Sequence, residues 1–149
     1  MTKEDIKNWK LVEVISNIEI VADDSTVYFE NLVEKLNIPL TNHIQTNREN
    51  TQIDWSKLTE YHRFFLDGEG EEEKNTAAFR SSELSQKKNL IFIYGYKEPA
   101  VLIPTSIFIN DWEDFIASTQ WETIIFSEDL ELIMEVSRDY NLHSNFKII

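Results

Sequence analysis

The sequence contains no cysteine and only three glycines, and its basic side chains number about half of its acidic ones. Without cysteine there are no disulfides, thiolate nucleophiles or cysteine-ligated metals, which excludes a disulfide-stapled secreted scaffold and a zinc ribbon. Three glycines cannot build a P-loop or a Rossmann fingerprint, because those loops need several where the backbone approaches phosphate. A signal-peptide apolar region and any run of about 18 apolar residues are also missing. These absences predict a cytoplasmic protein.

The charge balance predicts which classes of partner the protein does not bind. Asp and Glu total 27 against 14 Lys and Arg, for a net charge of -13. Charge of this sign repels phosphate backbones and anionic lipid headgroups, so neither nucleic acid nor a membrane surface is an expected partner. A hydrophobic fraction of 42% and 18 aromatic residues are nevertheless too high for a disordered acidic tail. We therefore expect residues 1–149 to fold as a single domain.

The acidic residues are concentrated in two stretches, and both are candidate partner-binding sites. Concentrated negative charge steers a basic partner and excludes wrong ones, although the same acids could simply be solvated. Two tryptophans, Trp112 and Trp121, accompany the second stretch, either as aromatic anchors or as core residues. In the second stretch Arg138 is the only base. The candidate residues of the first stretch are Asp67, Glu69, Glu71, Glu72 and Glu73; those of the second are Asp111, Glu113, Asp114, Glu122, Glu128, Asp129, Glu131 and Glu135.

Local patterns in the first half predict few elements. A capping pattern at Thr2 and Asp5 predicts a short N-terminal helix. A strand ending near Ala22 is followed by N-cap residues and an apolar stripe, which predict a helix over 27–36 that ends at Asn37. Residues 40–53 are polar and aperiodic, as in a long loop. A strand over 62–66 then leads into the acidic stretch at 67–73, which has the composition of an exposed turn or mobile loop.

The second half is punctuated more clearly. An apolar run over 90–96 predicts a central strand covered on both faces, and Pro99 turns the chain back into a second strand over 100–104. Asn110 and Glu113 form a capping pattern for a short helix. We expect a strand over 121–126, a helix capped by Ser127 and continuing to residue 137, and a closing strand near 146–148. This order predicts the α+β class, with a mostly antiparallel sheet and helices packed on one side.

Catalytic and metal-binding motifs are not recognisable. The three histidines, His43, His62 and His143, are far apart and not spaced as metal ligands, and we expect them to be partly exposed. No Gly-x-Ser-x-Gly elbow is present, and the acidic stretch around Gly68 does not fit an EF-hand loop. Alternation would send Glu60 and His62 to one face of a strand. We predict no catalytic residue, no metal site and no cofactor.

The last third of the chain resembles small bacterial immunity proteins of polymorphic toxin systems. The resemblance rests on Val101–Pro104, Trp112–Phe115, Ile124–Leu130 and Ile133. The Smi1-like immunity superfamily is one such group, although this chain lacks its glycine-rich central pattern. The resemblance implies a compact acidic protein that binds a toxin domain, often a basic nuclease, and blocks its active site. It implies no catalytic residue and no particular contact residue.

The leading hypothesis is therefore a non-enzymatic, acidic, protein-binding immunity protein that neutralises a basic toxin. Two alternatives stay open: an intracellular adaptor or regulatory domain, and a hydrolase built from scattered carboxylates and histidines. The last alternative requires a deep pocket that holds at least two of those groups.

Overall fold

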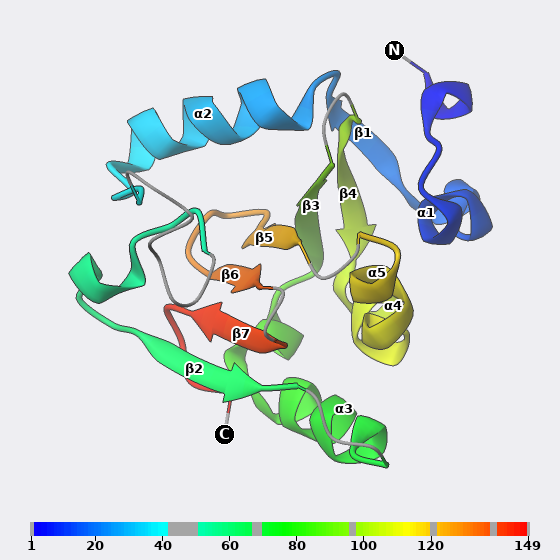
Figure 1. Ribbon diagram of the computed structural model, residues 1–149. Coiled ribbons are helices and arrows are strands. Elements are labelled where there is room, and N and C mark those ends of the chain that lie inside the picture. Colours follow the sequence, from blue (N-terminus) through cyan, green and yellow to red (C-terminus); the bar gives the residue numbers. More distant parts are fainter. Residues whose placement is uncertain are drawn as a thin grey trace.

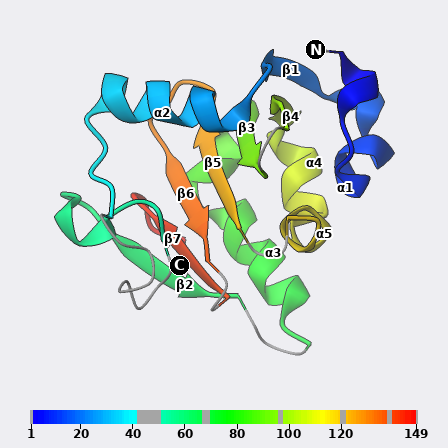
Figure 2. The same ribbon diagram turned by 45° about the horizontal axis from the view of Figure 1, so that its top comes forward.

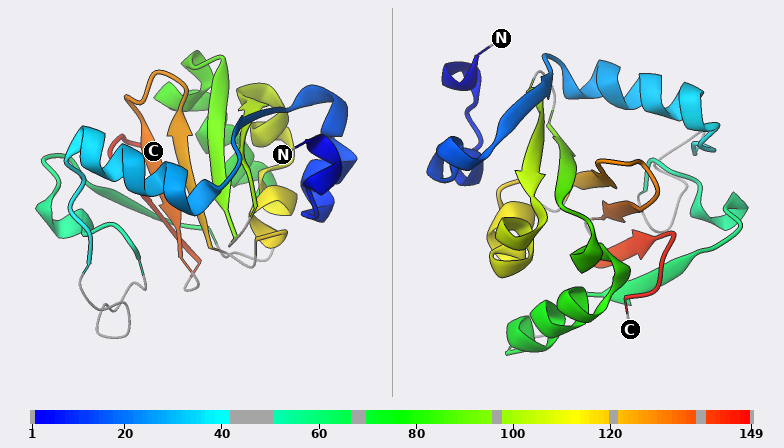
Figure 3. Two further views of the ribbon diagram at one scale, coloured as in Figure 1. Left: turned by 90° about the horizontal axis from the view of Figure 1, so that it is seen from above. Right: turned by 180° about the vertical axis from the view of Figure 1, so that it is seen from behind.

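A seven-stranded antiparallel sheet forms the centre of the molecule (Figure 1). The computed structural model describes residues 2–41, 51–66, 70–95, 98–119, 122–137 and 140–148. The sheet has the order β1-β4-β3-β5-β6-β7-β2, and Figure 3 shows β1 and β2 at its two far edges. Its strands are β1 (Glu19–Ala22), β2 (His62–Phe65), β3 (Asn89–Tyr94), β4 (Ala100–Pro104), β5 (Thr123–Ser127), β6 (Ile133–Val136) and β7 (Asn141–Ser144).

The described residues form five α-helices and several short 3-10 segments before and between the strands. The helices are α1 (Trp9–Glu13), α2 (Ser25–Leu36), α3 (Glu72–Ser81), α4 (Thr105–Asn110) and α5 (Trp112–Ala117). The 3-10 segments are η1 (Lys3–Asp5), η2 (Ile15–Asn17), η4 (Trp55–Lys57) and η5 (Glu83–Gln86). Within the described residues, no helix is long and apolar enough to cross a membrane.

Side chains from both faces of the sheet are buried in two separate cores. In β3, Leu90 and Phe92 point into one core, whereas Ile91 and Ile93 point into the other. The first core is covered by α1, α3, α4 and α5, and the second by α2 and η4. Figure 2 shows α2 on one side of the strands and α4 and α5 on the other. A strand covered on both faces has no polar side, which explains the uninterrupted apolar run of β3.

The predicted α+β class and antiparallel sheet are confirmed, with one difference in the helix layer. Four helices share one face as expected, but α2 packs on the opposite face. The predicted helix over 27–36 is α2, whose N-cap is Asp24 and whose C-cap Asn37 is in the left-handed region with φ 53°. The hairpin of β3 and β4 is also confirmed.

The predicted helix after Ser127 is wrong, because this segment forms the turn of a hairpin followed by β6. Leu130 has φ 65°, a left-handed conformation that would interrupt the predicted helix within its first turn. Ser127 N donates to Leu132 O at 2.9 Å, Ser127 O accepts from Leu130 N at 2.8 Å, and the Ser127 hydroxyl accepts from Leu132 N at 2.9 Å. Because β6 is buried on both faces, its apolar residues do not alternate with polar ones. The pattern therefore fits the repeat of a helix as well as that of a strand.

Two further predictions differ from the structure. The acidic stretch was expected to be a turn, but Glu72–Ser81 is helix α3; residues 67–69 lie outside the described part. The closing strand is β7 at Asn141–Ser144, a few residues before the predicted one.

The N-terminal capping box at Thr2 and Asp5 exists, but it caps the 3-10 segment η1. Of the predicted 40–53 loop, residues 42–50 are outside the described part.

Candidate functional site

The two acidic stretches of the sequence meet where α3 packs against α5. Trp112, at the start of α5, donates its indole N–H to the Thr76 hydroxyl of α3 at 2.9 Å, and its ring lies 5.7 Å from that of Phe79. Trp112 is 3% exposed, so it is a core residue, as one of the two interpretations predicted. The acidic side chains around this contact are exposed. We call Glu72, Glu73, Asp111, Glu113 and Asp114 the α3–α5 acidic surface.

Like charges are crowded within this surface. The pKa of Glu113 is raised above its ordinary range, first by partial burial and then by the negative charges of Glu72 and Asp114. Glu72 and Glu113 belong to the first turns of α3 and α5, where carboxylates favour the positive ends of the helix dipoles. The helix termini therefore hold these carboxylates in place against their mutual repulsion.

A buried lysine beneath this surface offsets part of its charge. The side chain of Lys10 is 1% exposed, and its Nζ lies 3.0 Å from Asp111 and 3.8 Å from Asp114. It also contacts Glu13 at 3.2 Å and lies 5.4 Å from the centre of the Phe115 ring. Burial lowers the pKa of Lys10, but the hydrogen bonds to Asp111 and Glu13 outweigh it, so the pKa is raised. Glu72, Glu73 and Glu113 have no ion pair among the described residues.

Three other candidate residues lie at the β5–β6 turn and have partners there. Lys87 bridges Asp129 at 2.6 Å and Glu131 at 2.8 Å, and Asn89 donates to Glu128 at 3.1 Å. Lys87 and the Ser127 hydroxyl lower the pKa of Asp129 to about 2. Arg138 is the only base within this stretch of the sequence, but Lys10 and Lys87 come from other parts of the chain and pair with its acids. Arg138 and Asp139 are outside the described residues.

Glu135 does not belong to the exposed acidic surface. It is 3% exposed and accepts hydrogen bonds from Gln52 N at 2.7 Å, Ile53 N at 3.2 Å and Trp55 Nε1 at 3.0 Å. Burial raises its pKa to about 7, although these three donors act in the opposite direction. As a buried residue it cannot contact a partner, so its prediction as a binding residue is wrong. Its role is to attach residues 52–55 to the sheet.

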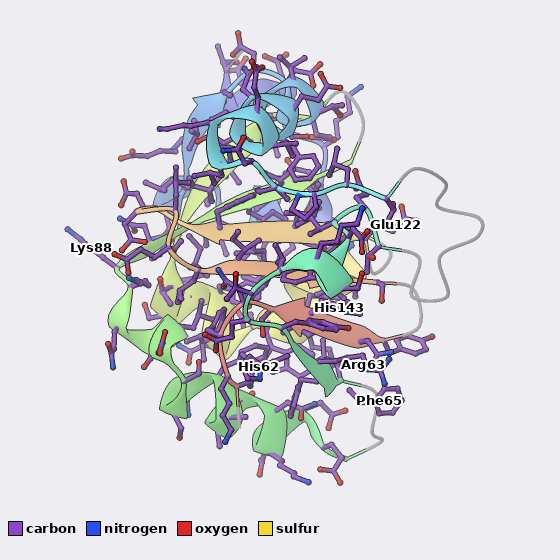
Figure 4. All side chains as sticks on the ribbon, turned by 90° about the vertical axis from the view of Figure 1, so that its left-hand side faces the viewer. His62, Arg63, Phe65, Lys88, Glu122 and His143 are labelled. Atoms are coloured by element: carbon purple, nitrogen blue, oxygen red, sulfur yellow. The ribbon has the colours of Figure 1, made fainter. Side chains whose placement is uncertain are left out.

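Glu122 lies at the opposite end of the sheet from Lys88, as Figure 4 shows. Two cavities of about 390 Å³ and 310 Å³ open at this end, and Tyr94, Gly95 and Glu122 line both. The larger cavity also contains Glu98, which accepts a hydrogen bond from the Tyr94 hydroxyl at 3.1 Å. Burial, followed by the charge of Glu98, raises the pKa of Tyr94.

Three candidate residues, Asp67, Glu69 and Trp121, are outside the described residues. Glu71 is the N-cap of α3.

His143, labelled in Figure 4, has polar partners at both ring nitrogens. Its Nδ1 lies 3.0 Å from the Tyr61 hydroxyl and its Nε2 lies 3.2 Å from Ser137 Oγ. The rings of His143, Trp55 and Tyr61 form a group of three, with centroids 6.1 Å apart for His143 and Trp55, 5.9 Å for His143 and Tyr61, and 5.8 Å for Trp55 and Tyr61. His143 is 0% exposed, so the expectation that it is partly exposed is wrong. Neither His143 nor Glu135 lines the two cavities described above.

His62 faces away from this cluster. It bonds to Glu60 at 2.7 Å, which confirms that these two side chains share a face. His43 is outside the described residues, and within the described part no group of His, Asp and Glu is placed to hold a metal ion.

No protein-family model matches this sequence, and no curated protein is significantly similar to it. Of the predicted binding residues, the structure brings together Glu72, Glu73, Asp111, Glu113 and Asp114, and it separates them from Glu122 and from the β5–β6 turn.

Two basic features were missed by sequence reasoning. Lys10 is buried within an apolar helix, and Lys87 and Lys88 line a cavity together with Arg80. The sequence did contain one signal for the second feature: Lys87 and Lys88 are the only two adjacent basic residues in the chain.

Proposed function

We propose that this protein binds a basic protein through the α3–α5 acidic surface and inhibits it, as an immunity protein inhibits a toxin domain. One observation carries the proposal. Glu72 and Glu113, from the two separate acidic stretches, are exposed on helices α3 and α5, which the 2.9 Å hydrogen bond from Trp112 to Thr76 joins. The charge of Glu72 also helps to raise the pKa of Glu113. Like charges held together on a surface repel each other, and a cationic partner relieves that repulsion when it binds.

The position of these carboxylates favours protein binding. They are exposed on two helices that are joined by the Trp112–Thr76 hydrogen bond and the contact of Trp112 with Phe79. Helices packed on a core lose little conformational freedom on binding, which lowers the cost of association. The negative net charge of the whole chain adds long-range attraction for a basic partner.

A nuclease toxin is the partner class that we favour. An enzyme that cleaves nucleic acid carries lysines and arginines around its active site, because it must bind phosphates. An acidic surface that covers these side chains would block substrate entry without any chemistry. The resemblance of residues 101–133 to immunity proteins is the reason for choosing a toxin, and the cytoplasm is the compartment in which such an inhibitor would act.

Capture of the partner by charge-reversed variants tests the proposal. The wild-type protein and a Glu72→Lys/Glu113→Lys variant are immobilised, and bound proteins from the native host are compared at low and high salt. We expect a basic protein on the wild type that is lost as salt increases, and at least about tenfold weaker binding to the variant. Purified partner then gives the affinity by calorimetry.

A matched control variant is Glu30→Lys/Glu34→Lys. It changes the charge by the same amount at exposed positions of α2, which covers the other face of the sheet. If both variants weaken binding equally, net charge rather than the α3–α5 acidic surface is responsible, and this choice of surface is wrong.

The activity of the captured partner separates an inhibitor from an adaptor. We expect an equimolar amount of the wild-type protein to abolish the nuclease or other toxic activity of the partner. Binding without any loss of activity would instead support the adaptor or regulatory alternative.

A further inference from the structure

A basic cavity lies at the end of α3 that is opposite the acidic surface. Its volume is about 340 Å³, and it is lined by residues of α3, η5, α4 and the link between η5 and β3. Figure 4 shows Lys88 extending from this edge of the molecule. The side chains that matter here are Arg80, Lys87, Lys88, Thr105, Ser106 and Asn110.

No carboxylate lines this cavity among the described residues, although the chain has 27 acids and only 14 bases. Lys87 is held by Asp129 and Glu131, so its charge is largely offset. Lys88 is exposed and has no ion pair within the described part of the chain. Arg80 bonds to a neutral side-chain oxygen, Asn110 Oδ1, at 2.7 Å. Two positive charges are thus available to a ligand.

Arg80 is oriented as well as charged. Its bond to Asn110 uses one of the five N–H donors of the guanidinium group and restrains the position of that group. The remaining donors form the fork that matches the oxygens of a phosphate. Lys88 adds a second cation on a flexible stem, and Ser106 adds an exposed hydroxyl on α4.

A buried hydroxyl provides an independent observation. Thr105 is 3% exposed and lines the same cavity, and its Oγ1 has no hydrogen-bond partner in the described part of the protein. Buried polar groups without a partner are rare because desolvation is unfavourable. A ligand with several acceptor oxygens would satisfy this hydroxyl after a rotation about χ1.

We propose that this cavity binds a phosphate monoester of small-molecule size. A phosphate group presents three acceptor oxygens and about two negative charges, which suit the donors of Arg80, Lys88 and the two hydroxyls. The volume is larger than a phosphate ion needs and lies within the range of small-molecule pockets, so it leaves room for the esterified part. This site is separate from the α3–α5 acidic surface and does not depend on the function proposed for it.

The test is titration of the whole protein with ribose 5-phosphate, inorganic phosphate and ribose at constant ionic strength. Binding is followed by calorimetry and by the amide resonances of Lys88, Thr105 and Ser106. We expect saturable binding of ribose 5-phosphate, weaker binding of inorganic phosphate and none of ribose. If inorganic phosphate binds as tightly as the ester, the site is for a free ion, and the monoester proposal is wrong. No saturation by about 10 mM ribose 5-phosphate would overturn the proposal entirely.

Variants localise the binding. Lys88→Gln and Arg80→Gln should each weaken ribose 5-phosphate binding by about tenfold, the expected effect of losing one hydrogen bond to a charged group. The control is Lys74→Gln, which removes the same charge from an exposed position of α3 outside the cavity. If Lys74→Gln weakens binding equally, the anion is attracted only by the electrostatic field of the whole protein, and the assigned site is wrong.

Thr105→Val tests the hydroxyl. Valine has the same shape without the oxygen, so the folded protein should be retained while binding weakens several-fold. Unchanged affinity in a folded Thr105→Val variant would remove Thr105 from the site.

Discussion

Trp55 and Glu135 meet in the interior through one hydrogen bond, from the indole Nε1 to Oε1 at 3.0 Å. The two residues are 80 positions apart in the sequence, and each is 3% exposed. The same carboxylate accepts bonds from the backbone of Gln52 and Ile53. One acid therefore attaches the segment before η4 to β6, and its protonation state should affect the stability of the protein.

The first prediction concerns pH. Burial raises the pKa of Glu135 from 4.5 to about 7, so the folded protein binds this proton more tightly than the unfolded chain. The stabilisation is complete below pH 4.5 and is lost as the pH rises through about 7. At about 1.4 kcal/mol per pH unit, the loss is about 3 kcal/mol. Urea unfolding at several pH values between 4.5 and 8 measures it.

Glu135→Gln is the matching variant, because its amide remains neutral and its oxygen can still accept from Trp55. The variant should lose this decline in stability between pH 4.5 and 8. His143, which pairs with Glu135 across β6 and β7, is present in both proteins. Parallel stability curves for the two proteins would contradict the pKa assigned to Glu135.

The second prediction concerns the charges of the α3–α5 acidic surface. Partial burial and the charges of Glu72 and Asp114 raise the pKa of Glu113. Replacing Glu72 with Gln removes one of these charges, so the pKa of Glu113 should fall toward its ordinary value without reaching it. Titration of the Glu113 carboxyl carbon by NMR measures the change. Glu30→Gln on α2 is the control and should leave the pKa of Glu113 unchanged. If the pKa of Glu113 is also unchanged in Glu72→Gln, the charges of the two acidic stretches do not interact.

Local sequence signals predicted those parts of the fold that local interactions determine. The N-cap Asp24 and the left-handed Asn37 delimit α2; the sequence predicted the end at Asn37 and offered Asp24 among several N-cap residues at the start. Helix α3 has no such signal, because its apolar face consists of little more than Phe79. Its start is fixed instead by a tertiary contact, in which buried Asn75 donates to Leu66 O at 3.1 Å.

The binding surface was predicted only in part for a related reason. The sequence located the acidic stretches, but the number of neighbouring acids does not reveal which of them are neutralised. Lys10 is 101 residues from Asp111, and Lys87 is 42 residues from Asp129. At such separations in the sequence, the packing of helices and strands determines which basic side chain pairs with which acidic one. The same packing buries Glu135, which no local pattern distinguishes from the exposed acids around it.

The third prediction concerns Lys10. Lys10→Met retains most of the buried stem and removes the charge that contacts Asp111 and Glu13. Because these partners are about half exposed, we expect a loss of about 1 kcal/mol in the free energy of unfolding, at the lower end for charged hydrogen bonds. Since its pKa is raised, the contribution is complete at pH 7 and is lost only as the pH rises above about 10.5. Urea unfolding at pH 7 measures it.

Lys7→Met is the control for Lys10. It removes the same charge from an exposed position three residues earlier, where we expect a change within about 0.5 kcal/mol. Equal effects of the two variants would mean that total charge, rather than the buried ion pairs of Lys10, accounts for the loss.

The fourth prediction concerns the hairpin turn that replaces the expected helix. Asp129 joins the turn to Lys87, and the same carboxylate accepts bonds from the Ser127 hydroxyl and from Glu131 N. Asp129→Asn preserves the size of the side chain and removes its charge. The variant should therefore unfold at lower urea than the wild type at pH 7, and added salt should reduce the difference.

Acid should abolish this difference. The pKa of Asp129 falls from 3.8 to about 2 in the folded protein, so its contribution is present above pH 3.8 and is lost as the pH falls through about 2. Glu128→Gln provides the comparison, because Glu128 is exposed and bonds to the neutral Asn89. If Glu128→Gln destabilises the protein as much as Asp129→Asn, the Lys87 bridge does not hold the turn. In that case the left-handed Leu130 and the bonds of Ser127 are sufficient to form the hairpin.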